Sequence, residues 1–164
     1  SGLNLEFSIS ATSRAKRVNE EDGKDYYFLT AEEFSQKIKH DEFVELVEVY
    51  QDHFYGTLKS EIERIWNKGN HVIFDVDVMG GISLKNIFGE RALSVFIMPP
   101  SVNTLRERLE NRGTDSSANI EMRIKKAKEE INSSGEFDLI IINDRLEEAC
   151  ENATREVRSF LEKK

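Results

Sequence analysis

Several residue types that mark specialised protein classes are scarce in this sequence. Its 164 residues include one cysteine, two prolines and nine glycines. The single Cys150 cannot form an intrachain disulfide, so a disulfide-stabilised framework is excluded. The few glycines and prolines exclude a collagen-like chain. No uninterrupted apolar run is longer than five residues, whereas a membrane-spanning helix needs about 20.

Zinc ligands and excess positive charge are missing as well. His40, His53 and His71 are scattered without a cysteine cluster, so no zinc-type site is expected. The formal net charge of −8 argues against general binding of polyanions such as nucleic acids. Any bound phosphate must therefore be held by a few well-placed arginines. Because no start resembles a signal peptide and cysteine is rare, we expect a reducing, cytoplasmic location.

The sequence does contain the pattern of an α/β domain, and its length favours a single one. Apolar runs with almost no alternation lie at residues 71–77, 93–98 and 137–142. Such runs are typical of strands buried on both faces of a parallel sheet. Helical patterns follow them at residues 83–88, 102–111, 118–132 and 146–161. Strands that alternate with helices predict a doubly wound fold.

Capping patterns predict where two helices begin. Thr30 and Glu33 have the spacing of a capping box, which predicts a helix that runs to about Lys39. Asp144 and Glu147 have the same spacing and predict the start of the last helix.

The first third of the chain has strands joined by short connections, which predicts a small antiparallel lobe. Strand patterns cover residues 5–10, 26–29, 42–50 and 54–57. Glu45 shares one side of its strand with apolar residues, where a carboxylate needs a partner. The helical pattern that follows has Ile62, Ile65 and Trp66 as its apolar stripe.

Two polar groups near strand ends could carry chemistry. A basic, hydroxyl-rich stretch follows a strand and contains Ser10, Arg14 and Arg17. Arginine guanidinium groups at such a place can bind phosphate oxygens with two hydrogen bonds each. A solvated basic loop explains this stretch as well. Asp75 and Asp77 end the first buried run and could support Mg²⁺ or accept from the N–H groups of a base. They could equally be caps of the next segment.

Arginines also surround a glycine-interrupted loop in the second half of the chain. Arg106, Arg108, Arg112 and Arg123 flank the segment that follows Gly113. This arrangement suits a lid that closes on phosphates and excludes water. Helix surfaces rich in arginine and glutamate are also commonly just solvated, so the pattern alone leaves both interpretations open.

The order of these segments resembles the guanylate kinase family, enzymes that transfer a phosphoryl group from ATP to GMP. The motifs in chain order are SISATSRAKR, GKDYYF, EFVE, FYGT, DVD, PPS, RLENRGTD and IIIND. The resemblance implies an α/β fold of the P-loop nucleoside monophosphate kinase type, with a parallel sheet flanked by helices. It implies one domain over residues 1–164, with a core of 1–13 and 56–164, an antiparallel GMP-binding lobe of about 14–55 and a lid of about 111–122.

The resemblance assigns GMP binding to two sets of residues. The implied phosphate ligands are Arg14, Arg17, Tyr26 and Tyr55, and the implied guanine contacts are Ser10, Glu45, Thr57 and Asp77. Guanine presents an N1–H and an amino group as neighbouring donors, which a carboxylate can accept as a pair. The place of Glu45 among apolar residues would then have a reason.

A further set is implied for ATP and catalysis. The implied catalytic residues are Arg14, Arg108, Arg112 and Arg123, and the implied ATP contacts are Arg108, Arg112 and Asn143. Asp75 would lie near the Mg²⁺ that accompanies ATP. The implied partners are the small molecules GMP and ATP, with no nucleic acid and no membrane, and a homodimer is left open.

The sequence departs from the family pattern in two places. Residues 50–55 form a loop one residue longer than the common form, which leaves open whether Phe54 or Tyr55 binds phosphate; the Tyr-Gly-Thr match favours Tyr55. Family members also begin with a strand, a phosphate loop of the form G-x-x-x-x-G-K-[ST] and a helix, and no such motif occurs in these 164 residues. We therefore expect a fragment that binds GMP but is catalytically impaired.

Two other functions stay open on the sequence alone. A non-catalytic guanylate-kinase-like module that binds phosphorylated peptides would also lack an effective phosphate loop. The lid motif Arg112-Gly113-Thr114 favours the enzyme, because arginines stabilise the phosphoryl group in transfer. The third candidate is a kinase for another nucleoside monophosphate.

Overall fold

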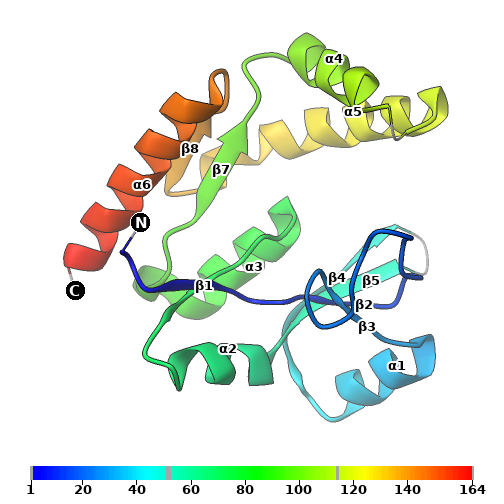
Figure 1. Ribbon diagram of the computed structural model, residues 1–164, viewed down its shortest axis with the longest axis vertical. Coiled ribbons are helices and arrows are strands. Elements are labelled where there is room, and N and C mark those ends of the chain that lie inside the picture. The colour runs from blue at the N-terminus through cyan, green and yellow to red at the C-terminus, as the bar shows by residue number, and fades with distance from the viewer. Residues whose placement is uncertain (1, 51–52, 114, 164) are drawn as a thin grey trace. The chain divides into compact units, whose positions relative to one another are not determined.

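The computed structural model describes residues 2–50, 53–113 and 115–163, apart from the side chains of 49 and 50. The chain divides into two compact units, Ser1–Ile87 and Phe88–Lys164. Each unit combines parallel strands with helices, which confirms the predicted α/β class (Figure 1). None of the helices in the described ranges is long and apolar enough to cross a bilayer.

In the first unit, two short strands form a parallel pair. β1 (Leu5–Phe7) lies beside β6 (His71–Ile73). The Ser8 N–H extends this pairing by donating to the Ile73 carbonyl at 2.9 Å. The chain then passes from β6 into α3 (Val78–Phe88).

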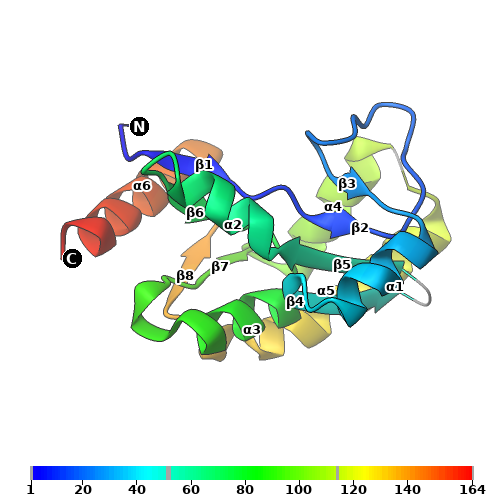
Figure 2. The same ribbon diagram turned by 90° about the horizontal axis from the view of Figure 1, so that it is seen from below.

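The helix α2 (Lys59–Trp66) runs along this pair (Figure 2). Its buried residues include Ile62 and Ile65, as the apolar stripe predicts. Trp66 is 52% exposed, so its predicted place in that stripe is wrong. Trp66 is the last residue of the helix, one position past Ile65, and a step of one residue turns a side chain away from the buried face.

A second sheet in the first unit forms the lobe. Its strands are β2 (Ala11–Thr12), β3 (Tyr27–Phe28), β4 (Phe43–Tyr50) and β5 (His53–Leu58), in the spatial order β3-β2-β5-β4. β5 is antiparallel to β2 and β4, but β2 is parallel to β3. The predicted antiparallel lobe is therefore a mixed sheet. Residues 13–26 separate β2 from β3, which is long enough for the crossover that a parallel pair requires.

The helix α1 (Ala31–Lys39) covers one face of this sheet (Figure 1). The predicted capping box is confirmed: the Thr30 hydroxyl accepts from the Glu33 N–H, and the Glu33 side chain accepts from the Thr30 N–H. Phe34 stacks on Phe43 with their ring centroids 4.6 Å apart. The buried core here consists of Ala11, Phe34, Phe43 and Leu58.

The second unit holds another parallel pair, β7 (Val95–Met98) beside β8 (Leu139–Ile142). Three helices accompany it, α4 (Val102–Arg112), α5 (Ser117–Asn132) and α6 (Leu146–Glu162). α4 packs on α5 and α6 packs on β8 (Figure 1). Buried apolar residues of this unit are Phe96, Ile120, Ile124, Ile141 and Ala149.

The strands are shorter and more exposed than the sequence predicts. The run 71–77 yields only the three residues of β6, and α3 begins at Val78, five residues before the predicted start. Ile97 and Ile142 are 54% and 58% exposed. A strand is buried on both faces only in a broad covered sheet, whereas these sheets each pair two strands.

The predicted cap of the last helix is also wrong. α6 has Arg145 at its N-cap, with no hydrogen bond from a capping side chain. Asp144 therefore lies one residue too early to cap. Glu147 and Glu148 in the first turn instead place negative charge beside the exposed N–H groups.

Candidate functional site

In the first unit, strand pairing brings polar residues of β2 and β5 together. Thr12 lies opposite Tyr55 in the register of β2 and β5. Arg14 follows two residues later, and its Nε–H donates to the Tyr55 hydroxyl at 3.0 Å. We call Arg14, Arg17, Glu20, Tyr26 and Tyr55 the Arg14 cluster.

Glu20 is the anionic member of this cluster. Its two carboxylate oxygens accept from the Arg14 Nη1 and Nη2 groups at 2.7 and 2.6 Å, a bidentate pair. It also accepts from the Arg17 N–H at 2.8 Å. The pKa of Glu20 is lowered to about 2, mainly by the hydrogen bonds from Arg14. No pattern in the sequence marks Glu20 as part of this cluster.

Aromatic rings complete the cluster. The Arg14 guanidinium carbon lies 5.0 Å from the centre of the Tyr26 ring, within cation–π range. The Tyr26 and Tyr55 rings meet edge to face at 5.9 Å. Burial raises the pKa of Tyr26, so its hydroxyl stays a proton donor. Phe54 packs instead near Phe34, 5.9 Å between ring centroids.

The four residues that the resemblance assigns to the phosphate are thus brought to one place. Arg17 is the most exposed of them, with 66% of its side chain accessible, and its Nη1 lies 3.8 Å from Glu20. Arg14 is only 10% exposed. The roles of these residues in binding stay predictions.

A buried carboxylate lies between β4, β5 and the start of α3. Glu45 is 7% exposed and lies opposite Thr57 in the strand register. The fully buried Thr57 hydroxyl donates to Glu45 Oε1 at 2.7 Å. Burial is the main cause that raises the pKa of Glu45, and the Asp77 charge adds to it. We call Glu45, Thr57 and Asp77 the Glu45 group.

Two glycines allow this close approach. A Cβ on Gly56 would lie 2.8 Å from the Glu45 carbonyl oxygen and 2.8 Å from the Phe43 ring. A Cβ on Gly80 would lie 3.3 Å from Glu45 Oε2 and 3.4 Å from Asp77 Oδ1. The Gly80 N–H also donates to Asp77 Oδ1 at 2.9 Å, so Asp77 caps α3 while facing Glu45.

Ser10 and Asp75 lie at strand ends of the same unit. Ser10 is half-buried, and its carbonyl accepts from the Tyr27 N–H at 2.9 Å. Asp75 is exposed after β6. Within the described ranges no group of three acidic, histidine or cysteine residues could hold a metal ion by itself. Mg²⁺ is commonly bound by one or two carboxylates plus substrate phosphates, and the exposed Asp75 fits such a role.

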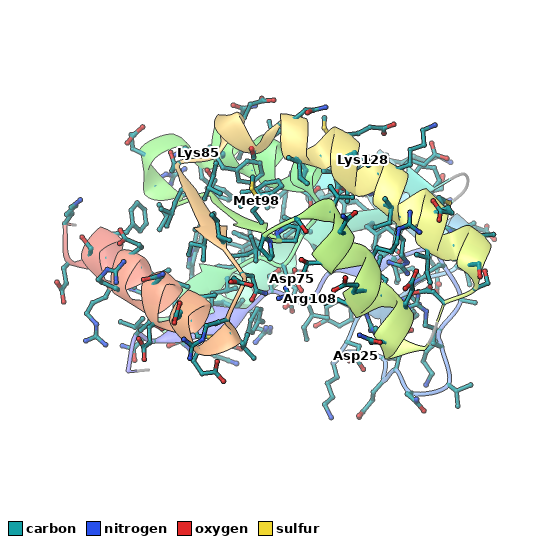
Figure 3. All side chains as sticks on the ribbon, turned by 90° about the horizontal axis from the view of Figure 1, so that it is seen from above. Asp25, Asp75, Lys85, Met98, Arg108 and Lys128 are labelled. Atoms are coloured by element: carbon teal, nitrogen blue, oxygen red, sulfur yellow. The ribbon has the colours of Figure 1, made fainter. Side chains whose placement is uncertain are left out.

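In the second unit, Arg108 ties α4 to the segment after β8. Its guanidinium donates to the carbonyls of Asn143 at 2.7 Å and Asp144 at 2.9 Å. Figure 3 labels Arg108 on α4. Two residues predicted on the ATP side, Arg108 and Asn143, are therefore in contact. Arg112 is exposed in the last turn of α4.

The predicted lid of about 111–122 is mostly helical. It contains the end of α4, the C-cap Gly113 with φ 66°, and the beginning of α5. Arg123 Nε lies 3.4 Å from Asp115 Oδ2. Thr114 of the predicted lid motif lies outside the described residues.

A further buried acid, Glu61, was not identified from the sequence. Glu61 is 3% exposed on the inner face of α2. It accepts from the Ile9 N–H at 2.9 Å and from the Tyr27 hydroxyl at 2.8 Å. The signal that could have found it is the one that singled out Glu45, a carboxylate at an apolar position, since Glu61 lies four residues before Ile65 and so on the same helix face.

Comparison with known proteins gives consistent results. The Guanylate kinase family model matches residues 2–163. Guanylate kinase of Porphyromonas gingivalis is 52% identical over 161 residues, which are 98% of this chain and 86% of that protein. Guanylate kinase of Bacteroides fragilis is 52% identical over 97% of this chain and 78% of its own. The crystal structure of guanylate kinase from Anaplasma phagocytophilum superposes with a TM-score of 0.80 at 33% identity, over 95% of this chain and 76% of that one.

Proposed function

Because the chain belongs to the guanylate kinase family, we propose that the Glu45 group and the Arg14 cluster bind GMP. The reaction that they serve is transfer of the γ-phosphoryl group of ATP to GMP, which gives GDP and ADP. The buried Glu45 carboxylate, whose Oε1 accepts from the Thr57 hydroxyl and whose pKa is raised by burial, carries this proposal. A buried carboxylate is stable when it accepts further donors, and guanine brings two.

Recognition of the base follows from that donor pair. The guanine N1–H and amino group would donate to Glu45. Ser10, Thr57 and Asp77 would contact the rest of the guanine edge. Adenine has no such pair of neighbouring donors. A site that depends on hydrogen bonds of this kind can reject a ligand that lacks them by about 10⁴–10⁵.

The phosphate would enter the Arg14 cluster. Arg14 already donates to Tyr55, to the Ala15 carbonyl and twice to Glu20, which uses four of its five N–H groups. The phosphate would therefore take the remaining N–H group, the Tyr26 and Tyr55 hydroxyls and Arg17, or displace Glu20. In either case the charge is met by arginines in a partly buried place.

The arginines of the second unit serve the ATP side. Arg108 and Arg112 would contact ATP phosphates, Arg123 would support the group in transfer, and Asn143 would contact the nucleotide. Arginines that stabilise the moving phosphoryl group are worth about 10³–10⁵ in rate. Asp75 would help to hold the Mg²⁺ that accompanies ATP, and that ion would neutralise phosphate charge when bound.

The 164 residues contain no G-x-x-x-x-G-K-[ST] phosphate loop. That loop supplies backbone N–H groups and a lysine to the β- and γ-phosphates. The residues that we propose for GMP are present without that loop, so we infer that these 164 residues bind GMP. Their single cysteine suits a reducing compartment.

Calorimetry with GMP and AMP tests the proposal. We expect GMP to bind and to raise the melting temperature, because a ligand at 100 times its dissociation constant stabilises by about 2.7 kcal/mol. AMP at the same concentration is the matched control and should give no shift. Absence of GMP binding at millimolar concentration, or binding of a phosphoserine peptide without binding of GMP, would overturn it.

A further inference from the structure

Glu61 connects α2 to two segments that each end at a proposed GMP contact. Ile9, whose N–H donates to Glu61 Oε2, directly precedes Ser10. Tyr27, whose hydroxyl donates to Glu61 Oε1, directly follows Tyr26. One carboxylate therefore holds the guanine side and the phosphate side of the proposed site at once.

The carboxylate itself is firmly fixed. Arg64 donates to Glu61 Oε1 at 2.8 Å and to Oε2 at 2.9 Å. A third Arg64 donor binds Glu6 on β1. Burial alone would raise the pKa of Glu61, but the hydrogen bonds from Arg64, Ile9 and Tyr27 lower it on balance. We call Glu61, Arg64, Glu6 and Tyr27 the Glu61 network.

Adjacent residues of an extended segment point to opposite sides, which separates the two tyrosines by role. Tyr27 points to α2 and binds Glu61, whereas Tyr26 contacts Arg14 and Tyr55. Stability does not require this arrangement, because apolar residues in place of a buried ion pair are often neutral or stabilising.

We propose that Glu61 is a positioning residue that holds Ser10 and Tyr26 at the spacing which GMP needs. This inference rests on the proposed GMP site. Glu61 does not touch the ligand, so it acts only through Ile9 and Tyr27.

The sharpest test is Tyr27→Phe, which deletes one hydroxyl and keeps the ring. We expect GMP to bind about 3- to 10-fold more weakly, as loss of one hydrogen bond allows. Thr30→Ala is the matched control: it removes the α1 cap in the same lobe, lowers stability and leaves GMP affinity unchanged.

A double-mutant cycle with Tyr26→Phe separates positioning from a purely structural role. If Tyr27 acts through Tyr26, the loss caused by Tyr27→Phe shrinks in the Tyr26→Phe background. Additive losses, or unchanged GMP affinity in Tyr27→Phe, overturn the inference while the proposed function stands. If the unaltered chain does not bind GMP, the proposed function fails first.

Discussion

Glu45 and Glu61 are both buried carboxylates of the first unit, yet their surroundings differ. Glu45 accepts from Thr57 at one oxygen, and burial raises its pKa. Glu61 accepts from Ile9, Tyr27 and Arg64, and these donors outweigh burial and lower its pKa. The Glu45 group therefore has acceptor capacity for a ligand, whereas in the Glu61 network the carboxylate is occupied by donors of the chain itself.

The contrast shows how burial alone fails to identify a binding carboxylate. The two side chains are 7% and 3% exposed, so accessibility does not separate them. The number of donors does, because each donor stabilises the charged form and removes the need for a further partner. Four expected outcomes test this difference, beginning with the largest effect.

Glu45→Gln should weaken GMP binding by about 100-fold or more, since the amide NH2 of Gln opposes one of the two guanine donors and the other donor keeps only a neutral acceptor. Stability at pH 7 should be unchanged or higher, because the replacement removes a charge whose burial is unfavourable. Isothermal titration and urea unfolding measure the two quantities. GMP affinity that survives the change would show that Glu45 does not bind guanine.

Glu61→Gln should mainly lower stability, beyond the loss of GMP affinity that its positioning role implies. Removing one partner of a buried ion pair costs about 3–5 kcal/mol. We expect about 2–3 kcal/mol here, because the Arg64 side chain is 33% exposed. Urea unfolding at pH 7 provides the measurement, and a loss below that of Glu45→Gln would remove the distinction between the two acids.

Gly56→Ala should lower stability by about 1–3 kcal/mol, since its Cβ would lie 2.8 Å from the Glu45 carbonyl oxygen and overpack the site. Pushing β4 from β5 would also separate Glu45 from Thr57. Thermal unfolding reports the first effect and GMP titration the second. Gly135→Ala is the control, because its added Cβ would meet no described atom within 4 Å apart from the adjacent backbone.

The smallest effect is a difference in pH dependence. The raised pKa of Glu45 makes its contribution to stability largest below pH 4.5, and this contribution is lost as pH rises through the folded-state pKa. The lowered pKa of Glu61 gives stability above pH 4.5 that is lost as pH falls. Urea unfolding between pH 4 and 7 should therefore show that the free energy of unfolding of Glu45→Gln, relative to that of the unaltered chain, increases as pH rises. A constant difference would contradict the raised pKa.

Local patterns predicted much of the fold. The capping box of Thr30 and Glu33, the helices at 102–111 and 118–132, and the strand that carries Glu45 all depend on neighbouring residues, which the sequence displays. The predicted cap at Asp144 and the predicted place of Trp66 in the apolar stripe were wrong. Both depend on the single residue at which a helix starts or ends.

The proposed site was predicted in part. The alternation along its strand identified Glu45 as a carboxylate at an apolar position, and the motif order indicated Arg14, Tyr26 and Tyr55. Glu20 and Glu61 were missed because their partners, Arg14 and Tyr27, lie 6 and 34 residues away in sequence. Local sequence patterns do not reveal which distant residues pair in the folded chain.

The sequence by itself determined the family, the α/β class and the acid and arginine types that the site uses. Only the tertiary structure decided which carboxylate is satisfied and which has acceptor capacity left. The physical reason is that the free energy of a buried charge depends on the donors around it in space. Those donors reach Glu45 and Glu61 from different strands and helices, in an arrangement that strand pairing and helix packing create.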